Sequence, residues 1–222
     1  IGQVPAAGAA TSAAAAAASS PLSGGITALR FGADSKRMVV GCLSRAVHVL
    51  DLRQQGAVSR TNVDHRGAVR ALAVAPGDAA VASAGDAGQL LLHDFRAAAR
   101  LATLEGGGGG AADAESYGRH GHPHPVRRSL AFCPSDAGLL AAAGDGGAVA
   151  LWELRSRSLR AEWRALHGPA GVATGVCFQG GGSPDVMFSV GRDRRLCVLD
   201  ARMGSGGGGG GDEDRGGVAG AS

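Results

Sequence analysis

The sequence contains few aromatic residues, one lysine and little net charge. Phe, Trp and Tyr make up 4% of the 222 residues, Lys36 is the only lysine, and the formal net charge is +3. A charge this small and dispersed lacks the basic footprint of nucleic-acid binding, so we expect no nucleic-acid partner. No apolar run approaches the ~18 residues that a membrane helix needs. The alanine-rich start is too weakly hydrophobic for a signal peptide and has no basic flank, so we expect no membrane partner either.

The cysteines are few and widely spaced. Cys42, Cys133, Cys177 and Cys197 form no CxxC pair that would indicate a zinc or redox site, and the last three lie in apolar, strand-like runs. We therefore expect four buried, reduced thiols, as is typical of a cytoplasmic protein.

Glycine is abundant but unevenly distributed. The 39 glycines collect at 106–110 and 206–211, and alanines collect at 13–18. These tracts offer too little apolar area to offset the entropy of ordering them, and no Lys-Ser or Lys-Thr follows that would make a phosphate-binding loop. We therefore predict a disordered Ala-rich segment at 1–24, a flexible insertion at 105–119 and a disordered Gly-rich tail at 203–222.

Between these tracts the sequence repeats itself four times. Each copy has small residues and glycine, a polar turn, an apolar alternation, and then a large residue and an acid: VVGCLSRAVHVLD (Val39–Asp51), ASAGDAGQLLLHD (Ala82–Asp94), AAAGDGGAVALWE (Ala141–Glu153) and FSVGRDRRLCVLD (Phe188–Asp200). A second shared segment precedes each copy: ITALRF (Ile26–Phe31), VRALAV (Val69–Val74), RRSLAF (Arg127–Phe132) and ATGVCF (Ala173–Phe178). The final acids, at positions 51, 94, 153 and 200, are 43, 59 and 47 residues apart, and the longest interval contains the predicted insertion. A period of about 40–50 residues built from short strands predicts propeller blades.

The copies resemble the WD40 family, in which a repeat carries Gly-His near its start and Trp-Asp at its end. Asp64-His65, Gly121-His122 and Leu166-His167 occupy the first position, and Leu50-Asp51, His93-Asp94, Trp152-Glu153 and Leu199-Asp200 occupy the second. The resemblance implies an all-β fold, a partial WD40-type β-propeller with about four of the family's seven blades. We expect WD40 repeats over 25–202, in blades at about 25–64, 65–104, 120–165 and 166–202.

The resemblance also implies a structural role for the carboxylate of Asp193, which lies in a tight turn six residues before Leu199. We expect Asp193 to accept hydrogen bonds from turn amides and from His167, with Ser189 joining, so that it clamps the blade and is not catalytic. We expect a structural role also for His65, which corresponds to His167, and for Trp152, which stands at the Trp position that Leu199 takes in the last copy.

The turn is less regular in the other copies. The position of Asp193 is taken by Ser44, Ala87 and Gly146, and Asp86 and Asp145 come one place early. We therefore expect these blades to be clamped less well.

The order of the motifs resembles one family in particular, the WD-repeat proteins that target the γ-tubulin ring complex to centrosomes and spindles. The resemblance rests on HVLDL followed by Asp64-His65, GQLLLHD with His93 in place of Trp, PVRRSLAF and GAVALWELRSRS, and Leu166-His167-Gly168-Pro169 followed by GVCF and SVGRDRRLCVLD. It implies a non-enzymatic scaffold at the microtubule-organising centre and spindle pole, acting in microtubule nucleation and spindle assembly. The implied partners are γ-tubulin ring complex components, augmin-type factors or centrosomal proteins, with no cofactor, metal or small-molecule substrate. In that family a separate C-terminal helical region binds γ-tubulin complexes, so no residue of this chain is assigned that step.

Two other functional classes compete with this interpretation. One is a generic WD40 protein-interaction adaptor, such as a ubiquitin-ligase substrate receptor. The other is an enzyme, for which the sequence offers no exposed nucleophile motif such as GxSxG. Because the chain begins at Ile1 and holds about four of seven blades, we also expect it to be a fragment. Open blade edges would then make it aggregate or fold loosely on its own.

Two clusters of polar residues are candidate binding sites. HGHPHP (120–125) carries three histidines at alternate positions that suit a metal ion, but no Cys or acid lies beside them. We expect an exposed connecting loop there, in which His122 or His124 is the structural histidine of its blade. Arg45, Arg192 and Arg194 lie in turns expected on one face of the propeller, where they would contact an acidic protein partner or form a solvated rim.

Overall fold

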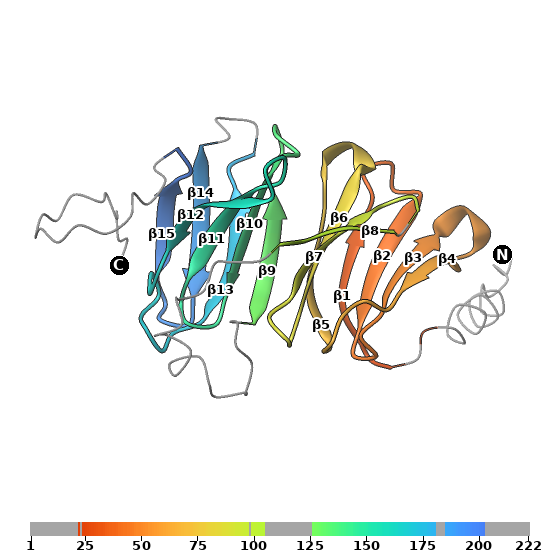
Figure 1. Ribbon diagram of the computed structural model, residues 1–222, viewed down its shortest axis with the longest axis horizontal. Helices are drawn as coiled ribbons and strands as arrows, with labels where there is room; N and C mark the ends of the chain where they lie inside the picture. The colour runs from red at the N-terminus through yellow and green to blue at the C-terminus, as the bar shows by residue number, and fades with distance from the viewer. Residues whose placement is uncertain (1–21, 23, 98, 105–125, 181–184, 203–222) are drawn as a thin grey trace, which may run out of the picture.

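The computed structural model describes residues 22, 24–97, 99–104, 126–180 and 185–202. These residues form four antiparallel sheets that lie side by side along the long axis of the molecule (Figure 1). Each sheet is formed by strands that follow one another in the chain, with β1, β5, β9 and β13 each at one edge. The sheets are called blades 1 to 4 in chain order.

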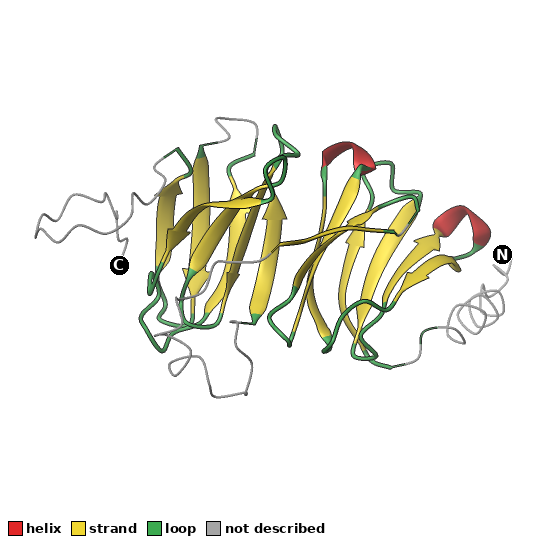
Figure 2. Ribbon diagram, viewed as in Figure 1, coloured by secondary structure: helices red, strands yellow, loops and turns green. Residues whose placement is uncertain are grey.

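Blade 1 contains β1 (Ile26–Phe31), β2 (Arg37–Cys42), β3 (Val47–Asp51) and β4 (Ala57–Asn62). Blade 2 contains β5 (Val69–Val74), β6 (Ala80–Gly85), β7 (Leu90–Asp94) and β8 (Arg100–Leu104). Blade 3 contains β9 (Arg127–Phe132), β10 (Leu139–Gly144), β11 (Val149–Glu153) and β12 (Ser158–Trp163), and the described part of blade 4 contains β13 (Ala173–Phe178), β14 (Val186–Gly191) and β15 (Leu196–Asp200). Two short 3-10 helices, η1 (Leu52–Gln54) after β3 and η2 (Pro76–Asp78) after β5, stand out among the strands (Figure 2).

The first strand of each blade lies on the inner side of the row. β1 contacts β5, β5 contacts β9, and β9 contacts β13, so the blades are arranged around a common inner side. These four strands are the second shared segments of the sequence repeat. The predicted fold, a partial WD40-type β-propeller, is confirmed.

The blades are held together by apolar side chains from facing sheets. The middle strands β10 and β11 are buried along almost their whole length, because blades cover them on both sides, and this explains their continuous apolar sequence. The contact between blades 2 and 3 includes Leu92, Leu130 and Trp152. Leu151, Phe178 and Met187 pack between blades 3 and 4, and Val49, Leu72 and Phe95 pack between blades 1 and 2. The core is therefore a series of layers between the sheets.

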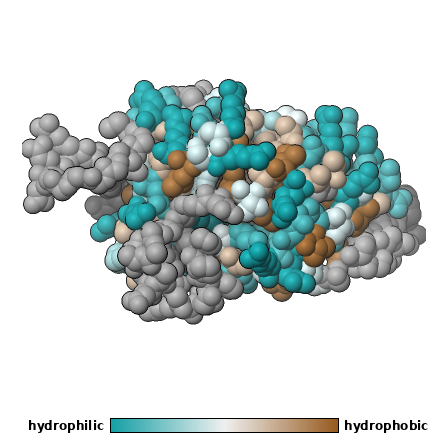
Figure 3. Space-filling model, in the orientation of Figure 1, coloured by the Kyte–Doolittle hydropathy of each residue, from teal (hydrophilic) through white to brown (hydrophobic). Residues whose placement is uncertain are grey.

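The two outermost sheets expose apolar side chains. Phe31 of β1 is 56% exposed and Leu196 of β15 is 47% exposed, and Leu29 and Val190 are exposed beside them in the same blades. Val190 and Leu196 are directly opposite in the β14–β15 pairing. On the face shown in Figure 3, hydrophilic residues predominate and hydrophobic residues form small separate areas.

The cysteine prediction is correct for three of the four residues. Cys42, Cys133 and Cys197 are buried and carry free thiols, but Cys177 is exposed, so its predicted burial is wrong. Side chains alternate along β13: Val176 and Phe178 are buried, while Cys177 between them points to the opposite face.

The predicted disordered segments lie almost entirely outside the described residues. This applies to the segment at 1–24 apart from residues 22 and 24, to the insertion at 105–119 and to the tail at 203–222. Within the described part of the chain, no helix has the length and apolar character needed to cross a membrane.

Candidate functional site

Blade 4 contains a chain of three hydrogen-bonded polar side chains. The Nδ1 atom of His167 lies 2.9 Å from Asp193 Oδ1, and its Nε2 atom lies 2.9 Å from Ser189 Oγ. Asp193 Oδ1 also accepts the backbone N–H of Arg195 at 3.2 Å, which closes the tight turn between β14 and β15. Because the carboxylate accepts from Nδ1–H, Nε2 is left as the acceptor for the Ser189 hydroxyl. The structure thus brings together the three residues that the sequence singled out in this blade.

The electrostatics of Asp193 fit a carboxylate that stays charged. Partial burial on its own would raise the pKa of Asp193, but the hydrogen bonds from His167 and from the Arg195 amide outweigh it, and the pKa is lowered overall. The ionised form is therefore the one that holds the turn.

These three side chains are hydrogen-bonded in the order of a Ser-His-Asp catalytic triad, but the serine is not accessible as it is in an enzyme. Ser189 and His167 are each 1% exposed, so no substrate can reach the hydroxyl. Nucleophilic catalysis needs a serine whose Oγ can approach a reacting carbonyl. The arrangement can hold a blade together, and it offers no reaction site.

Blade 2 contains a related group of hydrogen-bonded side chains. It includes His93, which stands at the Trp position of the repeat. Ser83 Oγ lies 2.7 Å from His65 Nε2 and 2.9 Å from His93 Nε2, so the hydroxyl bridges two imidazoles. Since the hydroxyl has one proton, it donates to one ring and accepts from the other. Nδ1 of both rings is buried without a hydrogen-bond partner. For His65, which corresponds to His167, the reason is that the turn has Ala87 where blade 4 has Asp193.

Both histidines of this hydrogen-bonded group in blade 2 are held neutral. Burial lowers the pKa of His65 to about 4, and the neighbouring charge of His93 adds to the effect. Burial likewise lowers the pKa of His93 to about 4. A carboxylate, Asp64, opposes both shifts without overcoming them.

Trp152 is the one tryptophan at the Trp-Asp position, and its polar atom is unpaired. The ring is buried, and Arg127 lies over it with the guanidinium carbon 5.4 Å from the ring centroid. Among the described residues, Nε1–H of Trp152 has no acceptor. The matching position of the neighbouring strand, which is Ser83 in blade 2, is Ala142 in blade 3. Trp152 therefore contributes through packing and not through a hydrogen-bonded chain.

A glycine at the end of the second strand makes room for each histidine. A Cβ atom at Gly191 would lie 2.5 Å from Cγ of His167, and one at Gly85 would lie 2.9 Å from Nδ1 of His65. Both distances are too short for a carbon atom, so the recurring glycine of the sequence repeat is required by the approach of the imidazole.

Two acidic residues, Asp86 and Asp145, have a role that the sequence did not reveal. Arg70 Nε and Nη2 lie 2.6 Å from Oδ1 and Oδ2 of Asp86. Arg128 makes the same two-pronged contact with Asp145, at 2.5 and 3.1 Å. Each pair joins the first strand of a blade to its tight turn. The signal that would have found them is the shared spacing of an arginine near the start of the blade and an acid one place early in the turn.

The predicted partner-contact residues lie in the expected turns. Arg45 is exposed in the β2–β3 turn, and Arg192 and Arg194 are exposed in the β14–β15 turn. These turns belong to blades 1 and 4, at opposite ends of the row (Figure 1). The structure therefore does not gather the three arginines into one compact patch.

The described residues contain no group of three or more His, Cys, Asp or Glu side chains that could hold a metal ion. The HGHPHP segment, with His122 and His124, lies outside the described residues.

Comparison with known proteins places the chain beside a human relative. No model of a protein family matches the chain. The human protein NEDD1 is 27% identical to the chain over 177 residues, which cover 78% of the chain and 24% of the relative. The chain thus spans about a quarter of the length of the curated relative that it matches. Together with the four blades, this similarity confirms the predicted resemblance.

Proposed function

We propose that the chain is part of a non-enzymatic WD-repeat scaffold that helps to target the γ-tubulin ring complex to the centrosome and spindle for microtubule nucleation. The observation that carries the proposal is the similarity, over 78% of the chain, to human NEDD1, the γ-tubulin ring complex-targeting WD-repeat protein. The order of the sequence motifs supports the same conclusion.

The site geometry supports a binding role over a catalytic one. The polar chains of blades 2 and 4 are buried, and they connect strands and turns within single blades. A fold by itself does not define an activity, so function belongs to the exposed turns and rims that such a scaffold presents. The partners on this proposal are γ-tubulin ring complex components, augmin-type factors or centrosomal proteins, met at the cytoplasmic microtubule-organising centre.

Exposed arginines on the turns of blades 1 and 4 are the proposed contact points for an acidic partner. Arg45, Arg192 and Arg194 are exposed, and tubulin surfaces are acidic. Two separate basic turns suit an extended partner that spans the row of blades, because charge complementarity across a broad surface speeds and orients association.

The test is localisation of the tagged chain in dividing human cells. We expect a signal at centrosomes and spindle poles, with γ-tubulin complex components among the proteins that proximity labelling from the chain detects. Charge reversal at Arg45, Arg192 and Arg194 is expected to weaken that signal without lowering the melting temperature.

A matched control keeps the total charge change the same. Charge reversal at Arg155, Arg157 and Arg160, which are exposed on blade 3, should leave the signal in place. A diffuse signal for the unaltered chain would contradict the proposal. If charge reversal at Arg45, Arg192 and Arg194 also lowered the stability, the loss of signal would not show that these arginines contact a partner.

A further inference from the structure

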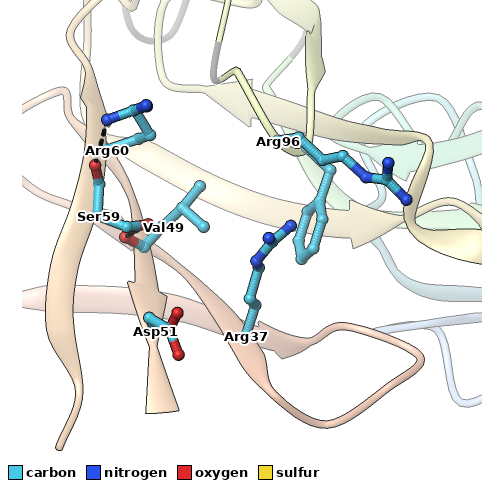
Figure 4. A pocket seen from close by; sticks show the side chains of 7 residues that line it. Arg37, Val49, Asp51, Ser59, Arg60 and Arg96 are labelled. Atoms are coloured by element: carbon cyan, nitrogen blue, oxygen red, sulfur yellow. Dashed lines mark hydrogen bonds between the residues drawn. The ribbon is translucent and has the colours of Figure 1, made fainter. Parts of the chain in front are cut away.

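A groove of about 150 Å³ lies between blades 1 and 2, at the edge where β2 begins and β3 ends (Figure 4). Arg37 comes from the start of β2, Arg60 from the outer strand β4, and Arg96 from the turn after β7. Figure 4 shows Arg37 and Arg96 on one side of the groove and Arg60 on the other. The groove is therefore lined by three arginines from two blades.

The three arginines that line the groove lack direct ion pairs with described residues. Among the residues that the structure describes, no acid forms an ion pair with Arg37, Arg60 or Arg96. Asp51 also lines the groove, but Arg53 already holds it through both carboxylate oxygens, at 3.1 and 2.9 Å. The groove consequently carries a net positive charge, with three arginines and one carboxylate in its lining.

Arg96 departs from the pattern of the equivalent arginines in blades 1 and 4. In those blades the arginine two residues after the final acid pairs with that acid, as Arg53 does with Asp51 and Arg202 with Asp200. Asp94, in contrast, accepts only the backbone N–H groups of Arg96 and Ala97, at 2.7 and 2.6 Å. The side chain of Arg96 is thereby released to border the groove.

Arg37 is held in place by its neighbours. Its guanidinium carbon lies 6.0 Å from the centroid of Phe95, which is fully buried, so the ring attracts and positions the charge. A cation that is already positioned loses less side-chain entropy when a ligand binds.

Size and charge together define the ligand. Pockets for small molecules and cofactors usually measure about 300–1,000 Å³, so a groove of about 150 Å³ suits a single side chain of a protein. One carboxylate would leave most of the local charge uncompensated, whereas a phosphorylated side chain carries a charge of about −1.5 to −2. Guanidinium groups also match the geometry of phosphate oxygens, and clusters of them recognise phosphorylated segments.

We propose that this groove binds a phosphorylated serine or threonine side chain of a protein partner. The inference goes beyond the proposed function, because it holds whichever protein carries the phosphate and does not depend on centrosomal localisation. It assigns a binding role to the rim between blades 1 and 2, at the opposite end of β2 from the turn that carries Arg45.

The test uses the full chain and immobilised peptide libraries with one fixed central residue and random flanks. Three libraries carry phosphoserine, serine or glutamate at the fixed position. We expect the chain to be retained by the phosphoserine library and at least about tenfold less by the other two. Reversing the groove charges in R60E/R96E should abolish this difference, because both side chains are exposed and neither has an ion pair to lose.

The control variant is R155E/R160E. Arg155 holds the place of Arg96 in blade 3, and Arg160 is an exposed arginine of β12, the outer strand that corresponds to β4, so the charge change is the same. Phosphoserine retention that persists in R155E/R160E and is lost in R60E/R96E supports the proposal. Equal retention on the glutamate library, retention unaffected by R60E/R96E, or no retention by the unaltered chain would each overturn it. Circular dichroism of both variants checks that the fold is preserved, and the milder variant R60Q/R96Q replaces R60E/R96E if it is not.

Discussion

Acidification should destabilise this protein through the two buried histidines of blade 2. His65 and His93 are 3% and 2% exposed and share the hydroxyl of Ser83. Burial lowers the pKa of each to about 4, from an ordinary value near 6.5. The folded state therefore favours neutral imidazoles, while the unfolded chain takes up protons at a higher pH. Their contribution to stability is complete above pH 6.5 and is lost as the pH falls from 6.5 towards 4.

The size of the effect follows from proton linkage. A group whose pKa is 6.5 in the unfolded chain and about 4 in the folded one loses about 2 kcal/mol of stability between pH 7.5 and pH 5. Two such groups lose about 4 kcal/mol, which is a large part of the 5–15 kcal/mol that a domain usually has. The carboxylate of Asp64 raises the pKa of both rings, and the guanidinium of Arg100 lowers that of His93.

The assay is urea unfolding at pH 7.5, 6.5, 5.5 and 5.0, followed by circular dichroism and by tryptophan fluorescence. The variant H93Q removes one titrating ring and keeps an amide that can hydrogen-bond to Ser83. Even if H93Q is less stable at pH 7.5, it should lose about 2 kcal/mol less than the unaltered chain on going to pH 5. Identical pH dependence in the two proteins would refute the assignment of acid sensitivity to this pair.

Three further predictions concern single positions. Ala87→Asp should give Nδ1–H of His65 the acceptor it lacks, stabilising the fold by about 1 kcal/mol in urea unfolding; no gain would show that the turn cannot present the carboxylate. Ala142→Ser should stabilise the fold by about 1 kcal/mol in the same assay by accepting from Nε1–H of Trp152, and a double variant with Trp152→Phe should lose the gain. Leu196→Ser should reduce self-association in light scattering, because the exposed apolar face of blade 4 loses its most exposed side chain, and unchanged association would place the contact elsewhere.

The strand framework could be predicted from the sequence because repetition and alternation report directly on burial. The segments Ile26–Phe31 and Ala173–Phe178, which were recognised only as recurring copies, are β1 and β13 with the same bounds. Continuous apolar runs such as Leu90–Leu92 are typical of strands buried on both faces, and these residues are buried in β7. Four aligned copies were enough to define the fold even though three lack the tryptophan.

The polar contacts between segments were harder to predict. The chain of His167, Ser189 and Asp193 was expected only because the family resemblance places these residues together. The ion pairs of Arg70 with Asp86 and of Arg128 with Asp145 join positions 16 and 17 residues apart. The spacing of arginine and acid recurs in the two blades, but it identifies partners only when the strands have been paired. Side-chain pairing across a sheet depends on register, which becomes visible only when the strands are paired.

The exposure of Cys177 shows a second limit. An apolar strand in the interior of a propeller is buried on both faces, and the sequence of β13 gave no reason to treat it differently. In blade 4, however, one face packs on blade 3 while the other carries exposed residues such as Val190. Which face of a strand is covered is set by its neighbours in the assembly and not by its own sequence.

The hydrogen-bonded polar groups differ from blade to blade because they contribute less to stability than the apolar packing between blades. Truncating a large apolar side chain between blades, such as Leu151 or Phe178, costs about 2–5 kcal/mol. A hydrogen bond within a blade contributes about 0.5–1.5 kcal/mol. The apolar layers therefore determine the fold, and the Trp-Asp signature can vary as it does here without loss of the architecture. Because the inner contacts carry the stability, the rims are free to differ from blade to blade, and the arginine-bordered groove between blades 1 and 2 lies on such a rim.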